Sequence, residues 1–135
     1  MSTRTEKVIT ADGVIAVIDG AIVEATRLGA CVVVTVVDPG GHPVAMTRMD
    51  GAPLLSIEVA ADKAWTAVAF GKPTHWWVDL LATQPDLATL GKGNRLMPVP
   101  GGVPLLVEGL VVGGVGVSGA SSDRDRQIAE AGAGA

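Results

Sequence analysis

The segment at residues 31–37, CVVVTVV, constrains the fold of this chain more than any other feature. β-Branched residues favour extended backbone, and a strand that is apolar at consecutive positions needs cover on both faces. Turn residues follow in DPGGH, and PVAMTRM then continues as a second strand-like run. Because the connection is short, we expect residues 31–37 and 43–49 to form an antiparallel hairpin, with the first strand in the centre of a sheet.

Helices are expected on both sides of this hairpin in the sequence. Apolar spacing predicts helices over 11–28 and 53–70, the second with a methyl-sized face that can lie close to a sheet. Thr74 is placed to cap a third helical piece, HWWVDLLAT, and Ser121 or Ser122 a fourth. The runs RLMPV, VPLLVE and GLVVGGVGVSG predict three further strands. This order indicates the α+β class, with a five-stranded antiparallel sheet and packed helices.

Composition excludes several classes of function. With 135 residues the chain is expected to form one domain over 1–135, with flexible ends at 1–9 and 130–135. The net charge is −4 and the basic residues are scattered, so we expect no nucleic-acid partner. No apolar run approaches the roughly 20 residues that span a bilayer, so we expect no membrane partner. Cys31 is the only cysteine, which favours a cytoplasmic protein.

The glycines of GVGVSG match the dinucleotide-binding spacing G-x-G-x-x-G at Gly114, Gly116 and Gly119. A true fingerprint needs a strand, a helix and a parallel strand around it, which the predicted strand order does not provide. We therefore interpret these glycines as part of a strand that accepts close packing by a neighbouring element.

Residues 47–65, TRMDGAPLLSIEVAADKAW, concentrate charge around the start of the second helix. Glu58 and Asp62 are four residues apart on one helical face, and Lys63 is poorly spaced to pair with either within the helix. The end of the hairpin feeds this helix and can bring opposite charges alongside it. The resulting charged cluster is either a solvated face or the wall of a pocket for a carboxylate, a cation or a metal. Its members are Arg48, Asp50, Glu58, Asp62 and Lys63.

The chain has two histidines, His42 and His75. His42 lies in the hairpin turn, where a solvated turn residue is the simplest interpretation. His75 precedes Trp76 and Trp77, so a soft ligand donor adjoins a flat aromatic surface. This arrangement is typical of a tetrapyrrole site, and equally of a tryptophan-rich subunit interface.

The pieces RMDGA, DKA, GGVPL and GVSG, in this order and spacing, resemble the GlcG/HbpS haem-binding family, which includes the C-terminal domain of the PduO adenosyltransferases. The resemblance covers nearly the whole chain. It implies a profilin-like fold, homo-oligomers built from dimers, and haem or another tetrapyrrole as ligand. The segment THWW departs from the polar residues usual after PT, and no repeated E-x-x-E element matches the iron-binding members.

The resemblance and the residues together lead to three hypotheses. The first is a small-molecule binding module in which Arg48 and Lys63 meet haem carboxylates and His75, Trp76 and Trp77 contact the ring. A metal would then be held by His75 or by Glu58 and Asp62. The second is a cofactor-independent catabolic lyase, isomerase or hydrolase acting on a small carboxylate or a ring-cleavage product, with Lys63 or Asp62 moving the proton and Arg48 anchoring the carboxylate. A buried lysine with a lowered pKa would favour it. The third is an accessory structural subunit whose tryptophans mark a protein interface.

Overall fold

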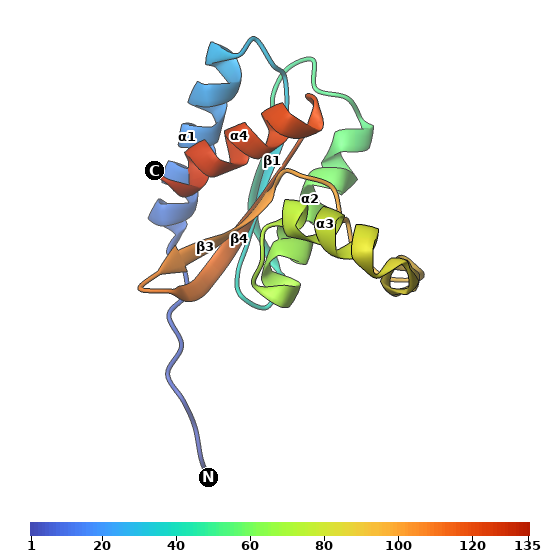
Figure 1. Cartoon of the computed structure of the whole chain (residues 1–135). Coiled ribbons are helices and arrows are strands. Elements are labelled where there is room, and N and C mark those ends of the chain that lie inside the picture. Colours follow the sequence, from blue (N-terminus) through green and yellow to red (C-terminus); the bar gives the residue numbers. More distant parts are fainter.

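A four-stranded antiparallel sheet divides the protein into three layers in the computed structural model, which describes residues 1–135 (Figure 1). The strands are β1 (Val33–Val37), β2 (Pro43–Arg48), β3 (Gly102–Val107) and β4 (Leu110–Ser118). Their order across the sheet is β2-β1-β4-β3, so β1 and β4 are central. Every residue of β1 is buried, which confirms the prediction drawn from its apolar run.

Helices cover both faces of the sheet (Figure 1). On one face lie α1 (Ala11–Arg27) and α4 (Ser122–Ala133), which pack against each other. On the other face lies α2 (Leu55–Phe70), followed by α3 (Thr74–Thr83) and a short 3-10 helix η1 (Pro85–Gly91). These helices include no segment with both the length and the apolar character that crossing a membrane requires.

The two faces of β4 carry different side chains because its sequence alternates between glycine and valine. Val115 and Val117 pair with Val36 and Val34, and all four belong to the core beneath α1 and α4. Gly114 and Gly116, which alternate with these valines, face α2. A β-carbon added at Gly116 would lie 2.0 Å from the carbonyl oxygen of Ala60, in the middle of that helix. The close packing predicted for the GVGVSG strand is therefore confirmed.

The prediction of five strands is wrong, because RLMPV does not join the sheet. Pro98 and Pro100 lack the N–H groups that a ladder of strand hydrogen bonds requires. The segment is instead held against α2 by the side chains of Thr66 and Asp62. The Thr66 hydroxyl accepts a hydrogen bond from the Met97 N–H at 2.8 Å and donates one to the Arg95 carbonyl at 3.2 Å.

Thr74 has a different role from the helix cap that the sequence predicts. The N-cap position of α3 is Pro73, and no side chain caps this helix. Thr74 is fully buried, and its hydroxyl accepts a hydrogen bond from the Gly102 N–H at 2.8 Å. This contact ties the start of α3 to the first residue of β3. The expected cap of α4 is confirmed, since Ser121 accepts a hydrogen bond from the Arg124 N–H.

Candidate functional site

An aromatic corner, consisting of Phe70, Trp76 and Trp77, forms where α2 ends and α3 begins. Gly71 adopts a left-handed conformation with φ +69°, which ends α2 and turns the chain into α3. The rings of Phe70 and Trp76 are stacked, with centroids 5.4 Å apart and planes at 22°. Trp77 meets both rings edge-on and is only 6% exposed, whereas Phe70 is 59% exposed. The corner therefore has a buried anchor and an open aromatic surface.

His75 is the second residue of α3 and directly precedes the two tryptophans of this corner. Its Nδ1 atom is buried and has no hydrogen-bond partner in the chain. Burial lowers the pKa of His75, and the nearby Arg126 guanidinium lowers it further, against the opposing carboxylates of Glu130 and Asp79. The imidazole is therefore neutral at neutral pH, which is the form that ligates a metal. Lys72 adds a cation, with its Nζ 5.8 Å from the ring centroid of Trp76.

The charged cluster predicted at the start of α2 is not assembled in one place. Arg48 donates two hydrogen bonds to the Ala52 carbonyl, at 2.9 and 3.2 Å, and so closes the turn before α2. Asp62 pairs with Arg95, 3.0 Å away. Asp50 and Glu58 are exposed. The repulsion between the two carboxylates on this face of α2 is therefore relieved in two ways. Glu58 is solvated, and Asp62 is neutralised by Arg95.

Lys63 points through the sheet layer instead of joining that cluster. The residue is 1% exposed, and its ammonium donates to the Val117 carbonyl at 2.9 Å and to the Asp125 carboxylate at 3.0 Å. Burial lowers the pKa of Lys63, and the attraction of Asp125 opposes this shift. A buried lysine of lowered pKa is the signature expected of a proton-transfer residue. However, Lys63 lines none of the four cavities of the molecule, and its ammonium is engaged by Val117 and Asp125.

The predicted ligand residues separate into two groups at opposite ends of α2. Arg48 and Glu58 lie near the start of the helix, and His75, Trp76 and Trp77 follow its end. Glu58 and Phe70 are about 18 Å apart along the axis at about 1.5 Å per residue. Nowhere do three side chains of His, Cys, Asp or Glu come together as ligands for a metal ion. A metal at His75, or at Glu58 and Asp62, therefore needs donors beyond these side chains.

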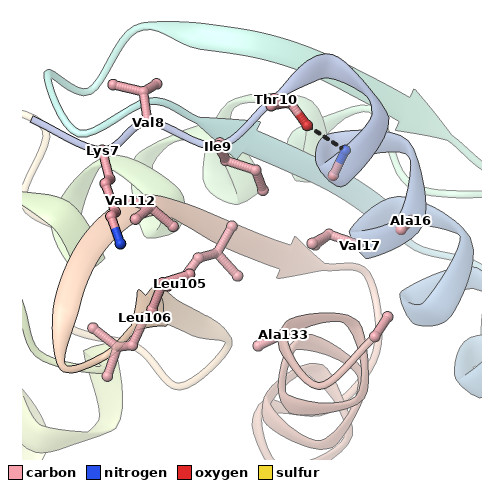
Figure 2. A pocket seen from close by; sticks show the side chains of 13 residues that line it. Lys7, Val8, Ile9, Thr10, Ala16, Val17, Leu105, Leu106, Val112 and Ala133 are labelled. Atoms are coloured by element: carbon pink, nitrogen blue, oxygen red, sulfur yellow. Dashed lines mark hydrogen bonds between the residues drawn. The ribbon is translucent and has the colours of Figure 1, made fainter.

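A cavity that the sequence analysis missed opens on the other side of the sheet (Figure 2). It has a volume of about 460 Å³ and lies between residues 7–10, α1, the β3–β4 hairpin and the end of α4. Ten of its 13 lining residues are hydrophobic, among them Ile9, Leu105 and Val112. No motif pointed to it, because ordinary apolar residues from four separate segments form its walls.

Comparisons with known proteins show which family the whole chain resembles. The model of the family described as "Haem degrading protein HbpS-like" matches residues 9–134. The corrinoid adenosyltransferase PduO of Citrobacter freundii is 40% identical over 114 residues, which cover 82% of this chain and 33% of PduO.

Solved structures show the same fold. The crystal structure of a double mutant of HbpS from Streptomyces reticuli superposes with a TM-score of 0.90 at 34% identity, covering 98% of this chain and 89% of that one. A crystal structure of a PduOC–haem complex superposes with a TM-score of 0.85 at 30% identity, covering 94% of each chain. The second of these proteins was crystallised with haem.

Proposed function

The chain belongs to the family of HbpS-like haem-degrading proteins, and we propose that it is a haem-binding module. The observation that carries this proposal is the likeness of nearly the whole chain to a protein crystallised in complex with haem. A fold alone does not assign a ligand, so the proposal also needs a surface of suitable chemistry in this chain.

We place the haem at the aromatic corner, with His75 as the iron ligand. The exposed ring of Phe70, stacked on the half-buried Trp76, offers an apolar aromatic surface for a porphyrin ring. Lys72, beside Trp76, supplies a cation for a carboxylate of the ligand. The neutral imidazole of His75 is in the state that binds iron, and because its Nδ1 is enclosed, Nε2 is the nitrogen that would meet the metal. When bound, haem would supply redox and oxygen chemistry at its iron.

Three of the residues that the sequence predicted as ligand contacts or catalytic groups do not contact the haem in this proposed site, because each is engaged elsewhere. Lys63 is engaged by Asp125 inside the core, so its ammonium does not reach a surface ligand. Asp62 is neutralised by Arg95. Arg48 lies at the other end of α2 and is bonded to the Ala52 carbonyl.

Replacing His75 by alanine is expected to weaken hemin binding at least about tenfold, which corresponds to about 1.4 kcal/mol. The reason is the loss of the proposed iron ligand, and the Soret band of the bound form should shift as well. The measurement is an absorbance titration of the purified protein with hemin at micromolar concentrations. Trp76→Ala should weaken binding without moving the Soret band, because it removes ring contact and leaves the ligand.

The other histidine provides a matched control. His42 is exposed in the β1–β2 turn beside Asp38, at 3.2 Å, so His42→Ala should titrate like the unmodified protein. If the unmodified protein shows no saturable Soret change, the haem proposal itself is contradicted. If His75→Ala binds hemin as tightly as the unmodified protein, the placement at His75 is contradicted and haem binding stands.

We also propose that the protein is a homo-oligomer built from dimers. Support comes from large apolar side chains left in solvent, above all Leu54 and Leu55 at the start of α2, each 74% exposed. They border a hollow of about 490 Å³ together with Ile57 and Glu58. Exposed apolar patches of this kind are typical of surfaces that meet another protein.

Changing Leu54 and Leu55 together to serine is expected to reduce the assembly to smaller species, because it removes apolar contact from the proposed interface. Folding should be unaffected, since both side chains are already in solvent. Size-exclusion chromatography with light scattering measures the mass. Leu90→Ser is the control, because Leu90 is 47% exposed on η1, away from this patch. A monomeric unmodified protein would disprove the assembly.

The compartment we propose is the cytoplasm. Cys31 is free and exposed in this structure. An exposed free thiol persists most readily where the surroundings are reducing.

A further inference from the structure

The cavity of Figure 2 is separate from the aromatic corner and is bordered by the chain segment before α1. β1 ends at Val37, opposite Gly114, so the first residues of β4 have no strand beside them on that side. Ile9 occupies this place, and its N–H donates a hydrogen bond to the Val112 carbonyl at 3.0 Å. The segment at residues 7–10 thus continues the sheet where β1 stops and forms one wall of the cavity.

Two details of the packing accommodate this wall. The side chain of Ile9 fits where two glycines leave room, because a β-carbon at Gly13 or Gly113 would lie 2.9 or 3.0 Å from its carbon atoms. Val112 is the extra residue of a β-bulge, because Leu105 pairs with Gly113 and Leu106 with Val111. Bulges of this kind redirect side chains and recur beside ligand sites.

Charge is confined to one edge of the cavity. Lys7 carries the only charged side chain in its lining, and its Nζ atom lies 3.2 Å from the Glu108 carboxylate in the β3–β4 turn. Figure 2 shows the Lys7 side chain on the same side as Leu105 and Leu106, whereas Val8 points away from them. Both partners of the ion pair are well exposed, at 57% and 77%, so the pair is weak and open to exchange.

We propose that this cavity binds a small amphipathic carboxylate. Its apolar tail would contact Ile9, Leu105 and Val112, and its carboxylate would take the place of Glu108 at Lys7. A volume of about 460 Å³ lies within the range of small-molecule sites, and such sites combine apolar walls with a few polar groups that orient the ligand. The single cation selects an anionic head group. This site is independent of the haem proposed at His75.

The role of the Lys7 charge is tested by isothermal titration calorimetry with octanoate and 1-octanol, two ligands of equal chain length. The unmodified protein should bind both, octanoate more tightly. Lys7→Met should lower the affinity for octanoate about threefold to fivefold, the range of one exposed ion pair, and leave the affinity for octanol unchanged. Absence of binding by either compound at millimolar concentration would overturn the proposal. The proposal would also be overturned if Lys7→Met bound octanoate as tightly as the unmodified protein, or if it lost the same factor of affinity for both compounds.

The location is tested by filling the cavity. Ala133 lines it from the last turn of α4, so Ala133→Leu should abolish binding of both compounds. Ala69→Leu adds the same atoms at an exposed position of α2 outside the cavity and should bind like the unmodified protein. Circular dichroism confirms that each variant is folded. Hemin titration separates the two sites, because Ala133→Leu should bind hemin normally. Loss of hemin binding in this variant would overturn the assignment of a second site.

Discussion

Gly116→Ala is expected to lower the free energy of unfolding by about 4 kcal/mol or more, a loss that few single substitutions cause. The added methyl group would lie 2.0 Å from the carbonyl oxygen of Ala60 and 2.5 Å from the backbone nitrogen of Ala64. Both atoms belong to the backbone of α2, so no side-chain rotation relieves the contact. The helix has to move away from β4, and its buried alanines lose their packing. Urea unfolding followed by tryptophan fluorescence measures the loss.

A matched substitution tests whether close approach is the cause. Gly91 has no atom within 4 Å of the position where a β-carbon would be placed, so Gly91→Ala should change stability by less than about 0.5 kcal/mol. Gly116→Ala should also weaken hemin binding in any folded fraction, because α2 carries Phe70 to the aromatic corner. If Gly116→Ala unfolds at the same urea concentration as the unmodified protein, the close contact between α2 and β4 is contradicted.

The sequence predicted the parts of the fold that depend on neighbours along the chain. The buried strand β1 follows from its β-branched run, and the β1–β2 hairpin from the turn residues between them. The approach of α2 to β4 follows from glycine at every second position, Gly114 and Gly116, because alternate residues of a strand share one face. The four-stranded sheet departs from the prediction only where Pro98 and Pro100 interrupt a run that otherwise looks like a strand.

The candidate site was predicted less completely, because its contacts join distant parts of the sequence. Helical spacing relates Glu58 to Asp62, but it carries no information about Arg95 or about Asp125, the actual partners of Asp62 and Lys63. The sequence did single out Trp76 and Trp77, which the structure brings to one corner with Phe70, and His75, which precedes them in α3. It gave no indication of the apolar cavity, whose lining residues have the composition of any core.

Lys63→Met is expected to lower the free energy of unfolding by about 3–5 kcal/mol at neutral pH. Lys63 neutralises Asp125, whose carboxylate is almost completely buried and also accepts a hydrogen bond from the Ala120 N–H at 2.9 Å. Removing the cation leaves a buried charge without compensation, and this costs more than the methionine gains by packing. Thermal and urea unfolding measure the effect. Arg126→Ala breaks the exposed ion pair with Glu130 and should cost less than about 1 kcal/mol.

Two further measurements separate lost charge compensation from lost packing. Adding Asp125→Asn to Lys63→Met should recover about 2 kcal/mol, because the asparagine oxygen still accepts from Ala120 while the uncompensated charge is gone. Burial raises the pKa of Asp125, and the removal of Lys63 takes away an influence that lowers it. A carboxyl group with a raised pKa in the folded state destabilises the fold as pH rises through that pKa. The deficit of Lys63→Met should therefore shrink as the solution is acidified from neutral pH. A deficit that stays constant with pH, and that Asp125→Asn does not reduce, would show that Lys63 acts in this core by its volume alone.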